Sequence, residues 1–466
     1  MARRLFSLSL QRLLHSAALI SCLAGVAPPA RAQFETRATT KLPQGAFAIA
    51  SGDFNNDGFA DVVVIDDNGF TVSLGKGDGT FQKAAFYKSQ LSYSLAVGDF
   101  NNDGNLDLVV ANLEPSTVDV YLGNGDGTFK KPISSNTTDG SYFVTVGDFN
   151  HDGKLDIAII DGPNVSILLG KGNGTFGAPS DNDSFYGAQW LAVGDFNNDH
   201  KLDVLTSGRL GSNYYVAVLL GNGDGTLQNS IDTPVEYITA TVAAGDMNGD
   251  GNLDAVLGDD LDGVAVLLGN GDGSFQPPVY YNTTGIGNGE VFVSDLNLNG
   301  RLDVVVPSAS HGSGGIDVFW GNGDGTLQQA QFFSAGSDTG LPAVGDLNGD
   351  GLPDISLANG EVGTISMLNT GVASFSPTTP LSFGGPGQQI LKLTNDGTKA
   401  LAISSIKASG AFEVRDTCGS SVRAGASCDI SVLFKPKGSG NYTGLLTLMD
   451  SASSKPQYIG LLGSSN

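Results

Sequence analysis

A nine-residue acidic phrase recurs along the 466-residue chain, and this repeat constrains the fold more than any other feature. The first copy reads Asp-Phe-Asn-Asn-Asp-Gly-Phe-Ala-Asp, and successive copies begin 46, 49, 47, 51, 49 and 51 residues apart. The seven copies start at Asp53, Asp99, Asp148, Asp195, Asp246, Asp295 and Asp346. A period of this size is typical of repeat architectures, in which each repeat forms one structural unit.

Each repeat carries signals for four short β-strands. In the second repeat we expect strands at residues 95–98, 106–111 and 118–122, and a weaker strand after Phe129. A second recurring phrase, GNGDGTF at residues 123–129, separates the third and fourth strands. It is rich in residues that tolerate positive φ, which predicts a tight turn. Related phrases begin at Gly75, Gly170, Gly221, Gly269 and Gly321, and a degenerate copy occupies residues 369–375.

Seven units of four strands predict an all-β fold, a seven-bladed β-propeller. Residues 34–40 precede the first acidic phrase where a fourth strand would lie, whereas the last repeat ends near Phe375 after three strands. We therefore expect the N-terminal segment to complete the last blade, which would close the ring and protect its strand edges. A β-helix with short calcium-binding turns is the structural alternative, but its period is far shorter.

The acidic phrase has the composition of a calcium site. Positions 1, 3, 5 and 9 carry Asp or Asn, and calcium takes six to eight hard oxygen ligands, commonly including a backbone carbonyl, here expected from position 7. A single copy could equally mark an ordinary hairpin turn. Seven copies in one frame favour cation binding, with up to seven Ca²⁺ ions. The expected ligands are Asp53, Asn55, Asp57, Phe59 and Asp61; Asp99, Asn101, Asp103, Asn105 and Asp107; Asp148, Asn150, Asp152, Lys154 and Asp156; Asp195, Asn197, Asp199, Lys201 and Asp203; Asp246, Asn248, Asp250, Asn252 and Asp254; Asp295, Asn297, Asn299, Arg301 and Asp303; and Asp346, Asn348, Asp350, Leu352 and Asp354.

Two copies depart from the common pattern, and two other kinds of cation site fit the phrase less well. His200 replaces the glycine at position 6 of the fourth copy, and Asn299 replaces the acid at position 5 of the sixth, so we expect weaker binding there. An EF-hand would close with an acid at position 12 and continue into a helix, neither of which fits. Magnesium prefers a stricter octahedral site with several retained waters, which favours calcium.

The two ends of the chain indicate export and a C-terminal module. Residues 1–32 have basic residues, an apolar stretch and an Ala-Arg-Ala ending, which predicts a secretory signal peptide. A lipoprotein cleavage box ending at Cys22 is the alternative. We expect no membrane span after the signal. Cys418 and Cys428 remain in the mature chain, and an exported pair ten residues apart predicts a disulfide more readily than a zinc site.

The charge balance excludes some partners. The chain has 48 Asp and Glu against 24 Lys and Arg, a net charge of −24, which disfavours nucleic acid and anionic membranes as partners. Many of these acids lie in the repeated phrases, which suits cation ligands. A hydrophobic content of 40% argues against disorder.

The residues 98–107 and 122–129, read together, resemble the FG-GAP or VCBS-type repeat. That family is similar to the propeller of integrin alpha subunits, and the resemblance implies calcium in blade loops and a role in adhesion or ligand recognition. It covers roughly residues 34–375. We therefore divide the chain into a signal (1–32), a propeller (33–375) and a C-terminal module (376–466).

After a linker at residues 376–380, alternating strands and turns predict an immunoglobulin-like sandwich. We expect its strands to include residues 389–393, 402–406, 430–434 and 444–448. The strand at 412–414, the two cysteines and the run 432–436 resemble choice-of-anchor D and related ASH-type domains. That resemblance implies an accessory β-module.

Strand direction suggests where recognition occurs. The acidic phrases and the Gly-rich turns should share one face of the ring, while the links and the loops between second and third strands share the other and vary among copies. Tyr93, Tyr142, Tyr186 and Trp190 fall in or beside the links, where they could bind a sugar or protein, although packing between blades is the alternative. We expect Trp320 to lie in the core.

The sequence favours a secreted, periplasmic or cell-surface binding or adhesion protein, acting as a monomer. Its four histidines match no zinc-protease or nucleophile motif. A calcium-dependent polysaccharide lyase or glycosidase is the alternative.

Overall fold

The computed structural model describes residues 34–40 and 46–465, apart from 67, 163, 183–187, 211–212, 237–238, 260–262, 288–289, 311–312, 337–340, 350–351, 360–362, 370–372, 377–380, 396–399, 424–425 and 451–456. These residues form strands and connecting turns and contain no helix, so the all-β prediction is confirmed for them. None of them belongs to a helix long and apolar enough to cross a bilayer. The expected signal peptide, Cys22, Tyr186, Asp350 and most of the linker lie outside the described residues.

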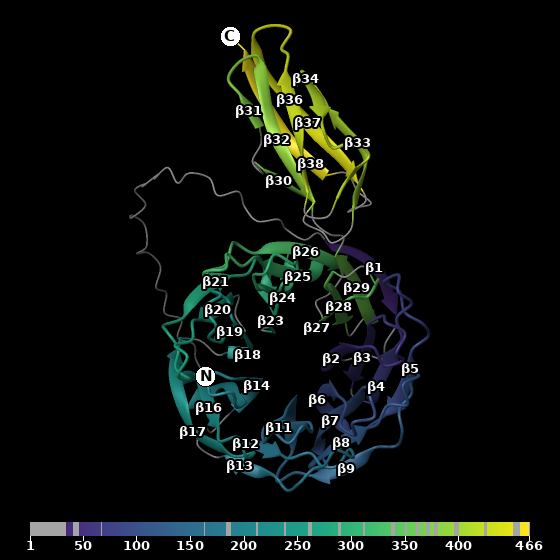
Figure 1. The fold of residues 1–466 in the computed structure, drawn as a ribbon, viewed down its shortest axis with the longest axis vertical. Helices are drawn as coiled ribbons and strands as arrows, with labels where there is room; N and C mark the ends of the chain where they lie inside the picture. The colour runs from purple at the N-terminus through teal and green to yellow at the C-terminus, as the bar shows by residue number, and fades with distance from the viewer. Residues whose placement is uncertain are drawn as a thin grey trace, which may run out of the picture.

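Within the described part of the chain, seven sheets stand around a ring, and each repeat supplies most of one sheet (Figure 1). Within each of the first five sheets the strands run antiparallel in chain order from the inner edge of the ring outward. The first sheet holds β2 (Ala48–Gly52), β3 (Asp61–Asp66), β4 (Gly69–Ser73) and β5 (Ala85–Lys88). The second holds β6 (Leu91–Gly98), β7 (Asp107–Glu114), β8 (Thr117–Tyr121) and β9 (Ile133–Asn136). The four strands expected in the second repeat are therefore confirmed.

The next three sheets repeat the same order. The third holds β10 (Ser141–Gly147), β11 (Asp156–Asp161), β12 (Asn164–Leu168) and β13 (Ser180–Asn182). The fourth holds β14 (Ala188–Gly194), β15 (Asp203–Leu210), β16 (Asn213–Gly221) and β17 (Leu227–Val235). The fifth holds β18 (Thr239–Gly245), β19 (Asp254–Asp259), β20 (Gly263–Leu267) and β21 (Val279–Asn282).

The last two sheets of the ring depart slightly from that order. In the sixth, the innermost strand is split into β22 (Ile286–Gly287) and β23 (Phe292–Ser294), both paired with β24 (Asp303–Ser310), which is followed by β25 (Ser313–Phe319) and β26 (Gln331–Gly336). The seventh holds β27 (Leu341–Gly345), β28 (Asp354–Asn359) and β29 (Gly363–Asn369), and its fourth strand is β1 (Phe34–Thr40).

The pairing of β1 with β29 closes the ring with the N-terminal segment, as the sequence predicts. The two strands are antiparallel from Phe34 opposite Asn369 to Thr40 opposite Thr364, with one irregularity between Thr36 and Ala38. Strands far apart in the sequence thus complete one sheet, and the outer edge of β29 is covered.

The core lies between neighbouring sheets, and the middle strands are buried on both faces. Successive residues of a strand point to opposite faces. In β7, Leu108 and Val110 pack with residues of the first sheet, whereas Val109 and Ala111 pack with residues of the third. This explains why these strands read as continuous apolar runs instead of alternating patterns. Trp320 follows β25 and is fully buried, as expected.

The C-terminal residues form two further sheets with their own core, outside the ring (Figure 1). One contains β30 (Ala373–Ser376), β32 (Gly387–Asn395), β36 (Ser427–Phe434) and β34 (Phe412–Asp416). The other contains β31 (Leu381–Phe383), β38 (Gln457–Ser465), β37 (Gly440–Asp450), β33 (Leu401–Ala408) and β35 (Ser421–Val422). Because β30 pairs with β32, residues 373–375 join this module, slightly earlier than the boundary expected after Phe375.

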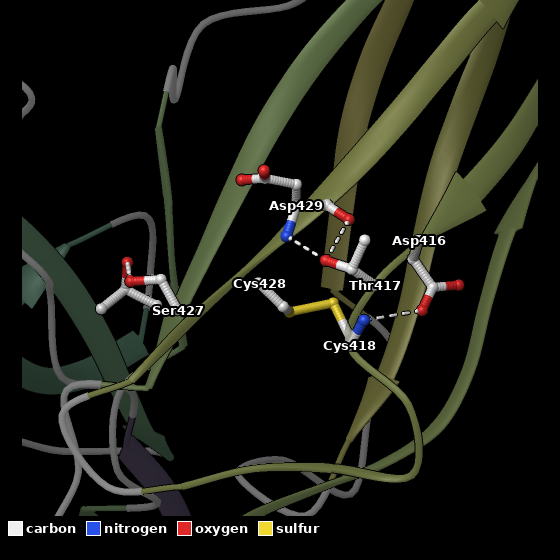
Figure 2. Close-up of a disulfide and its surroundings, with 7 residues drawn as sticks. Asp416, Thr417, Cys418, Ser427, Cys428 and Asp429 are labelled. Atoms are coloured by element: carbon white, nitrogen blue, oxygen red, sulfur yellow. Dashed lines mark hydrogen bonds between the residues drawn. A yellow bond between two sulfur atoms is a disulfide. The ribbon is translucent and has the colours of Figure 1, made fainter.

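A disulfide joins Cys418 and Cys428, as the sequence predicts (Figure 2). It connects the segment after β34 to the beginning of β36. The backbone beside it is tied as well, because the Thr417 N–H donates to the Asp429 carbonyl at 2.9 Å, and the Asp429 N–H donates to Thr417 Oγ1 at 2.9 Å.

Candidate metal centre

The side chains at positions 1, 3 and 5 of the six fully described acidic loops gather around the loop's own backbone. We use "acidic loop" for the nine residues of each phrase. In the second loop, Asp99 accepts N–H bonds from Asp103 at 3.1 Å and from Gly104 at 2.8 Å. Asn101 Oδ1 accepts the same Asp103 N–H at 2.8 Å, and Asp103 Oδ1 accepts the N–H of Asn105 at 2.9 Å. Oxygens from positions 1 and 3 therefore meet at one nitrogen.

The first six loops share this geometry. The position-1 carboxylate accepts the N–H groups of positions 5 and 6 at 2.7–3.2 Å in every one of them. In the seventh loop Asp350 lies outside the described residues. The structure thus brings the predicted side chains of positions 1, 3 and 5 together in each fully described loop.

The turn depends on left-handed backbone at two positions. Position 6 has φ near +64° to +88°, and is glycine except for His200 at +64°. An added Cβ at Gly104 would meet nothing within 4 Å, so the requirement there is conformational and not steric. Position 4 is also left-handed and carries Asn, His or Gly, except for Leu298 at +52°. Sequence reasoning found the first requirement but missed the second.

The closing aspartate at position 9 is fully buried and binds two backbone N–H groups. In the second loop, Asp107 Oδ2 accepts the Phe100 N–H at 2.9 Å and Oδ1 accepts the Gly123 N–H at 2.7 Å. All seven loops repeat this pair of bonds. Each closing aspartate therefore holds the start of its loop against the Gly-rich turn of the same repeat, a structural role that the sequence did not reveal.

Burial raises the pKa of the closing aspartates. The pKa reaches about 6 for Asp61, Asp107, Asp203 and Asp254 and about 7 for Asp303. Loss of solvation is the main cause, and the negative charges at loop position 1, and mostly also at position 5, raise the pKa further. The acids of one loop are therefore close enough to repel one another.

The Gly-rich turn of each repeat also contacts the acidic loop of the repeat before it. Gly127 donates its N–H to the Phe54 carbonyl, at position 2 of the preceding loop, at 2.9 Å. The same bond joins Gly174, Gly225, Gly273 and Gly325 to their preceding loops, and Gly79 of the first repeat bonds to Leu347 of the seventh. Where the seventh turn is degenerate, the side-chain amide of Asn369 donates to the Leu296 carbonyl at 2.6 Å. An uninterrupted circle of seven hydrogen bonds therefore links the loops.

The acidic loops offer carboxylate, amide and carbonyl oxygens, which are the ligands that a hard cation prefers. Among the described residues, no three Asp, Glu, His or Cys side chains are grouped so that they alone could hold a metal. The acidic loops add amide oxygens at position 3 and a carbonyl at position 7. A carboxylate has about four lone-pair sites, so those that accept two N–H bonds keep acceptor capacity. In the third and fourth loops, Lys154 and Lys201 bind the position-5 carboxylates at 2.7 and 3.2 Å and would compete with a cation.

Three of the four aromatic residues expected to recognise a ligand lie in the inner strands, and the fourth, Tyr186, lies outside the described residues. Tyr93 is in β6, Tyr142 in β10 and Trp190 in β14. The rings of Tyr93 and Tyr142 stack with centroids 6.3 Å apart, and Trp190 meets Phe143 at 4.7 Å. Tyr142 remains half exposed, whereas Tyr93 and Trp190 line a cavity described below.

A family profile described as an FG-GAP-like repeat matches residues 53–110, 99–159, 148–206, 246–306 and 295–357, more than half of the chain. Each match begins at the first aspartate of an acidic loop. No curated protein matches the sequence.

Several solved structures are similar to this chain at low sequence identity. An Agrocybe aegerita lectin, described as recognising non-reducing terminal N-acetylglucosamine, is 21% identical over 69% of this chain and 94% of its own, with a TM-score of 0.47. A humanized mutant of Chaetomium thermophilum Polycomb Repressive Complex 2 is 9% identical over 72% of this chain and 97% of its own, with a TM-score of 0.47. The Photorhabdus luminescens Tc holotoxin pore is 12% identical over 88% of this chain and 24% of its own, with a TM-score of 0.36.

Proposed function

Because this chain belongs to the FG-GAP-like repeat family, we propose that it is an exported, calcium-binding β-propeller that acts as a binding or adhesion module for a protein or carbohydrate. The seven sheets of the ring are its blades, and the two C-terminal sheets are an accessory immunoglobulin-like sandwich of the choice-of-anchor D type. The recurrence of one donor set in every acidic loop is the observation that carries this proposal.

In each loop the carboxylates and amides of positions 1, 3 and 5, the position-7 carbonyl and the buried position-9 carboxylate would hold the ion. Calcium supplies positive charge that offsets the repulsion among these acids. The chain's own contribution is to hold the loop closed through the position-9 bonds and the left-handed turn. Calcium on this account braces one face of the ring. Recognition then falls to the opposite face, whose links vary among repeats.

Calcium removal tests the brace. We expect the melting temperature to fall on treatment with EGTA and to return when calcium, but not magnesium, is added back, because a ligand that binds only the folded state stabilises it. Asp103→Asn in the second loop should weaken calcium binding measured by titration calorimetry. Asp126→Asn, in the exposed Gly-rich turn of the same repeat, is the matched control and should not. An unchanged melting temperature after chelation contradicts the proposal.

Ligand recognition and export need separate measurements. Purified protein should bind a member of a glycan or matrix-protein array, and binding should weaken with EGTA if the calcium-braced ring presents the surface.

N-terminal sequencing of exported protein should place the first residue near Gln33 if the signal peptide is cleaved there. A first residue at Cys22 would instead support lipoprotein processing.

A further inference from the structure

A cavity of about 360 Å³ lies at the axis of the ring, within the size range of small-molecule sites. Every one of the seven sheets contributes residues to it, from its innermost strand or the residues just before that strand. Figure 1 shows these strands, among them β6, β14, β18 and β27, at the inner edge of the ring. The aromatic residues on its wall are Phe47, Tyr93, Phe143, Trp190 and Phe292.

The cavity lies toward the face opposite the acidic loops. Its residues come mostly from the first half of the inner strands, such as Ala48 in β2 and Leu341 in β27. The acidic loops follow the other ends of the same strands, at Gly52 and Gly345. The cavity therefore belongs to the face of the links, where sequence varies among repeats.

One carboxylate faces this apolar space. Glu290, just before β23, is the only Asp, Glu, Lys, Arg or His among the described residues that line the cavity. No hydrogen bond or ion pair to it is found among the described residues, and burial raises its pKa to about 8. The hydroxyls of Ser94 and Thr241 already accept N–H bonds from Val144 and Val291 at 3.2 and 2.9 Å. Glu290 is thus the one side chain on the described cavity wall that can carry a charge near neutral pH.

We propose that this axial cavity binds a small organic cation, with an ammonium group against the Glu290 carboxylate and an apolar body among the aromatic rings. A poorly solvated carboxylate is costly to ionise without a partner, and a cation in contact with it lowers that cost. Aromatic faces such as those of Tyr93 and Trp190 also attract ammonium groups, more strongly where water is excluded. A neutral sugar would not stabilise the ionised carboxylate, and an anion would be repelled by it wherever the pH is high enough to ionise it.

This inference adds a ligand class to the binding face proposed above, but it does not require calcium in the loops. The ammonium group could be a quaternary ammonium or a protonated primary amine, and one probe of each kind distinguishes the two in the test below. The titratable groups on the cavity wall are Glu290 and Tyr93. A quaternary probe does not titrate, so any pH dependence of its binding near neutrality belongs to Glu290.

Titration with benzyltrimethylammonium, 2-phenylethylamine and neutral benzyl alcohol tests the proposal on the full chain with calcium present. We expect both cations to bind, to quench tryptophan fluorescence through Trp190, since Trp320 is fully buried, and to bind more tightly as pH rises from 6 to 9 for the quaternary probe. Benzyl alcohol should bind at least about tenfold more weakly, because it lacks the positive charge that contacts the Glu290 carboxylate.

Two variants give the controls. Glu290→Gln keeps the shape of the side chain and should lower cation affinity at least about tenfold while removing its pH dependence. Glu236→Gln, an exposed acid outside the cavity, should change neither. Equal binding of cation and alcohol, or unchanged affinity in Glu290→Gln, overturns the proposal, as does absence of binding to folded protein. Calcium titration of the same sample reports separately on the function proposed above.

Discussion

At the scale of single residues, the acidic loop requires left-handed backbone at positions 4 and 6. Glycine at either position adopts this conformation without strain, and Asn at position 4 adopts it more readily than most residues that have a Cβ. His200 and Leu298 do so at a cost, because a Cβ in the left-handed region meets the backbone. Both are natural departures in loops that otherwise keep the common hydrogen bonds.

Replacing His200 with glycine should stabilise the protein by about 1 kcal/mol, since the strained φ is relieved without loss of a core contact. Gly104→Ala in the second loop is the mirror-image control. Its φ is +85° with free space around it, so it should destabilise by about the same amount. Urea denaturation in EGTA measures both without the influence of calcium. Shifts of the same sign for the two variants would contradict this account.

The sequence predicted the residues of the loop better than their roles. Positions 1, 3, 5 and 9 stood out because they recur, but recurrence does not distinguish an exposed acid such as Asp103 from the buried Asp107. Glu290 was missed because it lies between the two parts of the split inner strand of the sixth sheet, in a stretch that does not repeat, and the cavity wall around it comes from all seven sheets. The aromatic residues were found by type, yet only the fold shows that Tyr93 and Trp190 share one cavity.

At the scale of structural elements, the buried aspartate at the start of each second strand fastens three pieces of one repeat. Asp107 is the first residue of β7 and binds the beginning of the acidic loop and the beginning of the Gly-rich turn. The four-strand pattern was predictable because turns and β-branched runs alternate in the sequence. The two hydrogen bonds of Asp107 were not predictable, because they join Phe100 and Gly123, which are far apart in the repeat, through one side chain.

Asp107→Ala should destabilise the protein strongly even without calcium, because two buried N–H groups lose their acceptor at about 1–3 kcal/mol each. Asp126→Ala removes an exposed acid that also accepts a backbone N–H, from Thr128 at 3.0 Å, and should cost much less because water can replace it. The free energy of unfolding in EGTA decides between them. Equal losses would mean that the position-9 aspartate acts only through calcium.

At the scale of the whole molecule, closure depends on a strand from the opposite end of the chain. The prediction that residues 34–40 complete the last sheet followed from a count of strands and is confirmed by the pairing of β1 with β29. The exact register, with its irregularity between Thr36 and Ala38, could not be read from the sequence because both strands alternate without a unique match.

Deleting residues 34–40 should leave β29 as an open edge, so we expect lower thermal stability and self-association through strand pairing. Size-exclusion chromatography with light scattering measures the second effect. Deletion of Asn466, which lies outside the described residues, is the control. A deleted chain that stays monomeric with unchanged melting would show that the ring holds without this strand.

Hydrogen bonds join neighbouring repeats all the way round the ring. The last repeat is joined to the first by the glycine N–H bond found at most other joins, and the Asn369 side chain makes the join between the sixth and seventh repeats. No repeat occupies a privileged beginning or end with respect to these contacts. Gain or loss of one whole repeat during evolution would change the circumference without leaving an unmatched join. The place where translation starts is, for this part of the architecture, arbitrary.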